Sequence, residues 1–142
     1  MITLYNVPVS SYGAKVRIIL AHKGIEWTEL APPDGYGSPA YRAVIPSGTV
    51  PAIIDGDLKL ADSEAIAEYL EETYSESPTL FPGNEGKHMA KLTMEWMDSQ
   101  NRELLTFIIL DIFAKLNAED QVYFRSNREE RFGMLLEEVQ AG

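Results

Sequence analysis

The sequence of 142 residues contains no cysteine. Without thiols it cannot form a disulfide framework, a cysteine-based zinc finger or a redox pair, and it cannot use a cysteine as its nucleophile. Any sulfur chemistry must therefore use a sulfur that a ligand brings. The two histidines, His22 and His88, have no neighbouring ligand residues in the sequence, so we also expect no metal.

Positive charge is scarce, with 12 Lys and Arg against 22 Asp and Glu, for a formal net charge of −10. Because nucleic-acid affinity comes mainly from basic side chains that release counterions, we expect no nucleic acid as a partner. The longest apolar run, residues 104–113, is interrupted by Asp111 and falls short of the ~20 residues of a membrane span. The chain opens on a strand-like run rather than a signal segment, so we expect a cytoplasmic protein that does not cross a membrane.

The first part of the chain alternates strand and helix patterns. Residues 2–5 predict a short strand, "AKVRIILAHKG" predicts a helix that Gly24 ends, and residues 25–30 predict a second strand. A turn-rich stretch follows that can hold only a short helix near residues 41–44. Two more strands are joined by Asp55-Gly56, a pair typical of a hairpin turn. Asp62 and Ser63 are capping residues that open a further helix.

The second part of the chain is predicted to be helical only. The stretch "SESPTLFPGNEG" is rich in Ser, Pro and Gly and indicates a domain boundary. Residues 87–116 contain no Gly or Pro and predict a helix on the order of 40 Å long. A last helix is predicted to start near Ser126 or Asn127, because Ser126 and Glu129 have the spacing of a capping box. Its apolar stripe would comprise Phe132, Leu135, Leu136 and Val139.

The long helix should be apolar around almost its whole circumference over residues 104–113. A helix of this kind must be covered on all sides. One later helix is too little to do so. We therefore expect either a partner subunit on this surface or a natural chain that continues beyond Gly142.

Two hydroxyls, Ser10 and Ser11, stand at the start of the first predicted helix. The unpaired N–H groups and the dipole of a helix start favour a ligand anion there. If the anion is a thiolate, a serine donor contributes about 1.5–3 kcal/mol and the dipole about 0.3–1 kcal/mol. At about 1.36 kcal/mol per pKa unit, the two together lower a thiol pKa of about 8.5 by more than one unit. The alternative is that these serines only cap the helix.

Two other short motifs are informative only in combination with these serines. Val50-Pro51 directly precedes a predicted strand, which alone indicates a turn. Asp62 and Ser63 could hold a ligand's ammonium and carboxylate groups, although such residues are also ordinary helix caps.

Together, the motifs and the order of elements resemble the glutathione transferase family. The resemblance rests on "ITLYNVPVSSYGAKVRIILAHKGIEW", "SGTVPAI" and "LADSEAIAEYLEE" and extends over the whole chain. It implies an α/β thioredoxin-like domain over residues 1–77, with a mixed four-stranded sheet in the order βαβαββα. A linker over residues 78–86 and part of an all-helical domain, residues 87–142, would follow.

The resemblance implies that Ser10 donates its hydroxyl to the sulfur of glutathione, as in serine-type classes that are zeta-like, theta-like or bacterial. Ser11 and Tyr5 are the alternatives for this role. Tyr12 replaces a cysteine that is common in zeta-like motifs, which argues against that class.

The other glutathione-binding residues implied by the family are Thr49, Val50, Pro51, Asp62, Ser63 and Arg42. Pro51 would follow a cis peptide, the Val50 backbone would pair with the cysteinyl part of the ligand, and Asp62 with Ser63 would hold its γ-glutamyl end. Arg42 is the nearest cation for the glycyl carboxylate, because Gly48 and Thr49 stand where the family often has a basic residue. Tyr12 and Trp96 are candidates for a second-substrate pocket, although aromatic residues in helices are more often core.

The function that follows from the resemblance is conjugation of glutathione, as a thiolate, to a small hydrophobic electrophile. Glutathione would be the co-substrate, and the protein would be a homodimer. The alternative is a non-catalytic module of the same fold that binds glutathione or serves as a scaffold.

Overall fold

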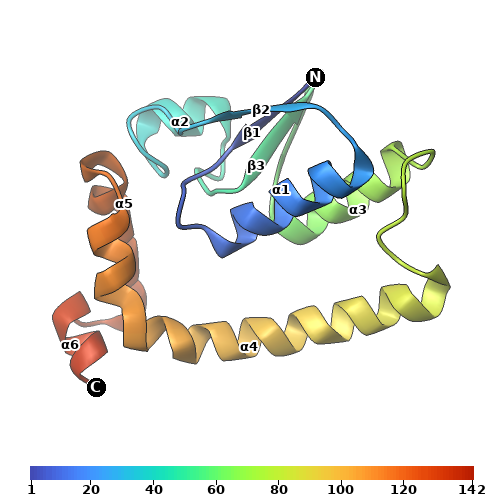
Figure 1. Ribbon diagram of the computed structural model, residues 1–142. Helices are drawn as coiled ribbons and strands as arrows, with labels where there is room; N and C mark the ends of the chain where they lie inside the picture. The colour runs from blue at the N-terminus through green and yellow to red at the C-terminus, as the bar shows by residue number, and fades with distance from the viewer. The chain divides into compact units, whose positions relative to one another are not determined.

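The computed structural model describes residues 1–142 apart from the side chain of residue 102. Its contacts divide the chain into two units, one comprising Met1–Thr79 with Leu116–Tyr123 and the other Leu80–Lys115 with Phe124–Gly142. The elements, drawn in Figure 1, are β1 (Ile2–Tyr5), α1 (Ser11–Lys23), β2 (Trp27–Leu30), α2 (Pro39–Val44), β3 (Ala52–Asp55), β4 (Leu58–Ala61), α3 (Ser63–Thr73), α4 (Gly83–Lys115), α5 (Ala118–Phe132) and α6 (Leu136–Ala141).

The first unit is built on a mixed four-stranded sheet with the order β2-β1-β3-β4. Strand β1 runs parallel to β2 and antiparallel to β3, and β3 forms a hairpin with β4. The hairpin turns at Asp55-Gly56, where Gly56 has a positive φ, as the sequence predicts. The element order and the mixed sheet expected for a thioredoxin-like domain are confirmed.

Helices α1 and α3 pack against each other (Figure 1), and α3 also contacts β3 and β4. Alternation along β1 and β3 turns Leu4 and Ile53, both fully buried, toward one face of the sheet. The helices supply the matching apolar residues, of which Val16, Leu20, Ile66 and Leu70 are fully buried. In each helix the two buried residues are four positions apart and so lie on one face.

Helix α2 supplies a second, smaller cluster. Tyr41 and Ile45 pack on Ala52, with Tyr5 and Val50 among the partly buried residues around them. Pro39 occupies the first turn of α2, and Ser38 caps it by accepting the Tyr41 N–H at 3.0 Å. A proline at this position costs the helix no hydrogen bond, which is why a turn-rich segment can still form one short helix.

Helix α4 is the longest element of the second unit and packs against α6. It begins at Gly83 rather than at the expected Lys87, so part of the predicted linker is helical. Ile109 is buried in this unit, whereas Leu104, Phe107 and Ile108 are exposed. The described residues therefore do not supply the cover that an all-round apolar helix requires.

The prediction of one last helix starting near Ser126 is wrong. Helix α5 begins at Ala118 and contains Ser126 and Asn127 in its interior, and a separate helix α6 follows the break at Gly133, where φ is +70°. The start of α5 is set by Asn117, whose Oδ1 accepts the Asp120 N–H at 2.8 Å. Acidic residues in the first turn, Glu119 and Asp120, favour the same start.

The loop before α2 belongs to the same unit as residues 116–123. The Tyr36 N–H donates to Oδ1 of the buried Asp120 at 2.8 Å, and the Tyr36 and Tyr123 rings meet edge to face at 5.0 Å. Residues 116–123 therefore pack with the first unit, although the sequence places them in the helical domain.

The helices of the described residues include none with the length and apolar character of a membrane span.

Candidate functional site

One row of residues runs across the sheet at the edge where β1 ends. Tyr5 is paired with Ala52, and Ala52 is paired with Ala61. Neighbours of this kind lie about 5 Å apart. The segments that continue from the row at this edge are the loop after Tyr5, the peptide before Ala52 and the helix start after Ala61, and these carry the three predicted motifs. The register thus brings together residues that are far apart in the sequence.

Ser10 is the N-cap of α1 and is half-buried. Its Oγ accepts the Gly13 N–H at 3.0 Å, and its own N–H donates to the Val7 carbonyl at 3.0 Å. A hydroxyl has one proton to donate besides its two lone pairs. The cap uses a lone pair, so the Ser10 proton remains available to an acceptor that lies at the N-terminal end of α1.

The two alternatives to Ser10 lie in different surroundings. Ser11 is the first residue of α1 and is exposed. Tyr5 packs its ring against Tyr41, with the ring centroids 5.4 Å apart, and so belongs to the cluster beneath α2. Among the three hydroxyls, Ser10 is the one that the local backbone fixes at the helix start.

The Val50–Pro51 peptide bond is cis. Pro51 is buried, Val50 half-buried and Thr49 exposed. The preceding loop is held by Tyr41, whose hydroxyl donates to the Thr49 carbonyl at 2.9 Å. Burial raises the pKa of this hydroxyl well above its ordinary value, and the nearby Tyr5 raises it further, so Tyr41 remains a hydrogen-bond donor at any physiological pH.

Sequence reasoning did not identify Tyr41 as a residue of the site. The signal available was weak, because an aromatic residue in a short helix is usually a core residue. Tyr41 is indeed fully buried, but its hydroxyl reaches the loop that carries Thr49 and Val50.

Arg42 lies near this loop, but its donors face the protein's own backbone. Its Nε donates to the Gly37 carbonyl at 3.0 Å, and one terminal nitrogen donates to the Ser47 carbonyl at 3.0 Å. The other terminal nitrogen reaches the Tyr123 hydroxyl at 3.5 Å, and the guanidinium lies 5.7 Å from the centre of that ring. Arg42 therefore ties the loop before Val50 to α2, and its predicted contact with a glycyl carboxylate stays a prediction.

Asp62 and Ser63 stand at the start of α3, where the sequence predicts them. Asp62 caps the helix through Oδ1, which accepts the N–H groups of Glu64 at 2.9 Å and Ala65 at 3.2 Å. Its φ of +80° is unusual for a residue other than glycine, and backbone strain of this kind clusters at functional sites. Two donors of the helix start are already satisfied, so a ligand carboxylate would be met by Ser63, through its N–H and its hydroxyl.

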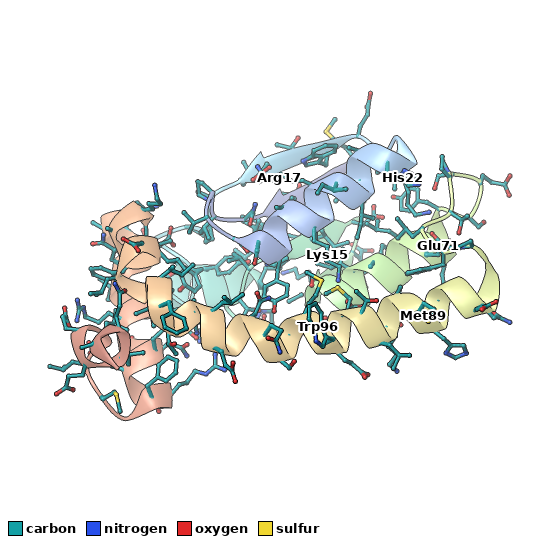
Figure 2. The ribbon with its side chains drawn as sticks, turned by 60° about the horizontal axis from the view of Figure 1, so that its bottom comes forward. Lys15, Arg17, His22, Glu71, Met89 and Trp96 are labelled. Atoms are coloured by element: carbon teal, nitrogen blue, oxygen red, sulfur yellow. The ribbon has the colours of Figure 1, made fainter. Side chains whose placement is uncertain are left out.

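The two residues predicted for a second-substrate pocket belong to different units. Tyr12 lies in the first turn of α1, two positions after Ser10, and 36 % of its surface is exposed. Trp96 lies on α4 with 65 % of its surface exposed, as does Met89 with 58 %; both are labelled in Figure 2. Trp96 is therefore not a core residue of its unit.

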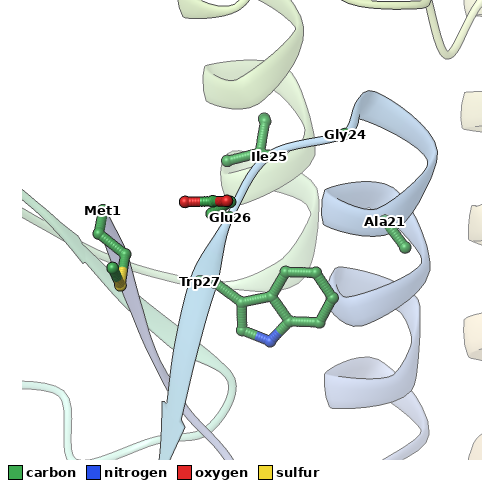
Figure 3. A pocket seen from close by; sticks show the side chains of 6 residues that line it. All are labelled: Met1, Ala21, Gly24, Ile25, Glu26 and Trp27. Atoms are coloured by element: carbon green, nitrogen blue, oxygen red, sulfur yellow. The ribbon is translucent and has the colours of Figure 1, made fainter.

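One hollow in the first unit lies elsewhere. It is shallow and is lined by residues at the starts of β1 and β2 and at the end of α1, shown in Figure 3: Met1, Ala21, Gly24, Ile25, Glu26 and Trp27. This end of the sheet is opposite the row through Tyr5, so the hollow is not part of the candidate site. Among the described residues no cluster of metal-ligating side chains is found.

A mixed four-stranded sheet with a cis-proline before β3 and helix starts gathered at one edge defines a thioredoxin-like domain. Comparison with known families assigns this domain more narrowly. The family model described as "Glutathione S-transferase, N-terminal domain" matches residues 4–78, and that described as "Glutathione S-transferase, C-terminal domain" matches residues 89–142. The chain belongs to the glutathione S-transferase family.

Individual relatives agree with this assignment. Glutathione S-transferase Z1 of Arabidopsis thaliana is 42 % identical over 81 residues, covering 54 % of this chain and 36 % of the relative. A stringent starvation protein A homolog of Histophilus somni is 33 % identical over 102 residues, covering 68 % of this chain and 48 % of the relative. The chain thus spans between a third and a half of these curated relatives.

Solved structures match over nearly the whole chain. Glutathione transferase GSTFuA3 from Phanerochaete chrysosporium aligns with a TM-score of 0.76 at 28 % identity, covering 96 % of this chain and 63 % of that one. A glutathione S-transferase of Ceriporiopsis subvermispora, solved in complex with glutathione, aligns with a TM-score of 0.76 at 26 % identity, covering 97 % and 63 %.

Proposed function

We propose that this protein binds glutathione at the edge of the sheet defined by Tyr5, Ala52 and Ala61, and that Ser10 activates the glutathione thiol as a thiolate. The observation that carries the proposal is the register of β1, β3 and β4. It gathers at one edge a hydroxyl at a helix start, the peptide before Pro51 and the start of α3. A tripeptide thiol has three matching parts: a sulfur, a backbone and a terminal α-amino acid group.

Ser10 is preferred to Ser11 and Tyr5 for activating the thiol because its hydroxyl is held by the Gly13 N–H. A held hydroxyl loses little freedom when it donates to a sulfur, so more of the hydrogen-bond energy stabilises the thiolate. The dipole of α1 acts on the same charge. Together they would lower the thiol pKa by more than one unit, at about 1.36 kcal/mol per unit.

The remaining contacts follow from the same edge. The Val50 backbone would pair with the cysteinyl unit, and Ser63 with Asp62 would take the carboxylate and ammonium of the γ-glutamyl unit. Thr49 and Arg42 would border the glycyl end. The electrophile would approach the sulfur from the side of Tyr12, and the active protein would be a homodimer.

Two measurements test this function. Calorimetric titration of glutathione into the protein should give saturable binding, and conjugation of a generic aryl halide should be lost in Ser10→Ala but kept in Ser11→Ala and Tyr5→Phe. Failure of the wild-type chain to bind glutathione would contradict the proposal as a whole. Binding without conjugation would favour the non-catalytic module, and sedimentation velocity of the same sample would test the dimer.

A further inference from the structure

Asn6 is a buried polar residue that the function described above does not use. It follows β1 directly, four positions before Ser10, and only 3 % of its surface is exposed. Its N–H continues the pairing of β1 with β2 by donating to the Leu30 carbonyl at 3.1 Å. Its side-chain Nδ2 donates to Oε1 of Glu29, also on β2, at 3.0 Å. The amide is therefore fixed in orientation, because a carboxylate can only accept.

The other end of the amide faces the first turn of α1. The Asn6 Oδ1 has no hydrogen-bond partner among the described residues. It also occupies the space next to Gly13, since a Cβ added at that glycine would overlap the Asn6 amide. A buried oxygen without a hydrogen-bond partner lowers the stability of the fold, so its presence needs an explanation. We look for that explanation in the contact between Asn6 and Gly13.

Gly13 is the residue whose N–H holds the Ser10 hydroxyl. The absence of a side chain at Gly13 lets the Asn6 amide occupy the position that a Cβ would take there. Asn6 thus contacts the residue whose N–H holds Ser10, while Glu29 binds the other end of the Asn6 amide. The contacts form a chain from β2 through Asn6 to the helix start.

We propose that Asn6 is a positioning residue for Ser10: its amide, held by Glu29, fixes the first turn of α1 so that the Ser10 hydroxyl stays aligned with the sulfur of bound glutathione. This inference rests on the proposed role of Ser10. Asn6 does not touch the ligand; it acts through Gly13. Its role explains why an amide with an unpaired oxygen stands at the end of β1.

The first test is independent of glutathione. Amide hydrogen exchange at Gly13 reports how often the bond from its N–H to Ser10 Oγ opens. In Asn6→Ala this exchange should be accelerated on the order of tenfold, whereas Asn117→Ala, which removes the corresponding cap contact of α5, should leave it unchanged. Unchanged exchange at Gly13 in Asn6→Ala would overturn the inference, whatever the protein binds.

The second test measures the reaction. The pKa of bound glutathione, followed by thiolate absorbance, should rise in Asn6→Ala by about half a unit or more, which corresponds to a factor of about three in thiolate at neutral pH. Asn117→Ala should not shift it. A wild-type protein that binds no glutathione would refute the proposed function, whereas a wild type with a lowered thiol pKa that Asn6→Ala leaves unchanged would refute only the role of Asn6.

The third test uses the contact between the two residues. Gly13→Ala alone should displace the Asn6 amide and raise the thiol pKa. The double variant Asn6→Ala/Gly13→Ala should have the same thiol pKa as Asn6→Ala, because the added methyl enters the space that the amide has left. Strictly additive effects would show that the residues do not act together.

If Asn6→Ala does not fold, variants of Glu29 test the same inference. Glu29→Gln keeps an acceptor for the Asn6 amide and should shift the thiol pKa less than Glu29→Ala, which removes the acceptor and should reproduce the shift of Asn6→Ala. Equal thiol pKa values in these two variants would overturn the inference.

Discussion

Tyr5 and Ala52 are paired across β1 and β3, and this pairing sets the position of every motif in the candidate site. Ala52 follows Pro51 directly and is paired in turn with Ala61, which precedes Asp62. A slip of one residue would turn the side chains of a strand to the opposite face of the sheet. The buried Leu4 and Ile53 oppose such a slip, because they would leave the core. The packing of the core thereby fixes the geometry of the site.

The bond from Tyr41 to the Thr49 carbonyl should matter for binding as well as for stability. Tyr41→Phe should lower the free energy of unfolding by about 0.5–1.5 kcal/mol, the contribution of one hydrogen bond, and weaken glutathione binding several-fold. Tyr69→Phe is the matched control, because it removes a 2.9 Å bond to Asp55 at the hairpin end of the sheet. Urea denaturation should give similar losses for both variants, with weaker binding in Tyr41→Phe alone. Equal binding by the two variants would contradict the role of Tyr41.

The support that Arg42 gives to the loop before Val50 and its predicted contact with the glycyl carboxylate lead to different expectations for Arg42→Met. This variant removes the bonds to the Gly37 and Ser47 carbonyls, and loss of that support alone should weaken the binding of glutathione and of its glycyl ethyl ester by the same factor. A direct contact with the carboxylate would instead make the loss clearly larger for glutathione than for the ester. Calorimetric titration of the two ligands into both proteins separates these outcomes.

Lys23 should be a major source of stability in the first unit. Its side chain is completely buried and forms an ion pair with Glu71 at 2.8 Å, with further bonds to the Ser77 hydroxyl at 3.0 Å and the Pro78 carbonyl at 3.1 Å. Removing the carboxylate leaves a buried charge without its counterion, so Glu71→Gln should cost about 3–5 kcal/mol in the free energy of unfolding.

The control for Glu71 is Glu64, which pairs with Lys15 at 2.6 Å on the surface; Lys15 and Glu71 are labelled in Figure 2. A surface pair contributes about 0–1 kcal/mol, so Glu64→Gln should change little. Chemical denaturation of both variants measures the difference. Equal losses in the free energy of unfolding would contradict the claim that the buried pair of Lys23 and Glu71 stabilises the fold more than a surface pair does.

Tyr74 should make stability depend on pH in the alkaline range. Its hydroxyl donates to Oδ2 of Asp55 at 2.6 Å, and this bond, together with burial, raises the pKa of Tyr74 from 10.0 to about 12. The unfolded chain releases the proton near pH 10.0 and the folded chain only near 12, so the stabilisation is present in full below pH 10.0 and is lost as pH rises toward 12.

Tyr74→Phe has no such proton to lose. Its free energy of unfolding should therefore approach that of the wild type between pH 10.0 and about 12, the interval set by the raised pKa of Tyr74. Unfolding measured across this interval, with tyrosinate absorbance to follow the titration, tests the point. A constant difference between the two proteins would contradict it.

Local signals in the sequence were sufficient for most of the first unit. Gly24, with φ of +65°, ends α1 where the sequence predicts it, and Asp55-Gly56 forms the expected hairpin turn. These features depend on a few adjacent residues with special backbone preferences. The position of Ser10 as a cap follows from the same kind of signal.

Other features depend on contacts over long distances in the sequence. The start of α5 was missed because Ser126 and Glu129 offer a capping pattern, while the pattern of Asn117 and Asp120 that sets the true start has the same spacing. Burial of Asp120 against the Tyr36 N–H selects the second pattern. The partners of Arg42 likewise depend on how the loop of residues 46–49 folds back on α2, which composition does not reveal.

The central claim is that Ser10 lowers the pKa of bound glutathione. Difference absorbance of the thiolate, recorded across pH for the wild type, Ser10→Ala and Ser11→Ala, measures this pKa directly. We expect a wild-type value more than one unit below the usual thiol pKa of about 8.5, a return toward that value in Ser10→Ala, and no change in Ser11→Ala. A Ser10→Ala protein that binds glutathione with the same thiol pKa as the wild type would contradict the account.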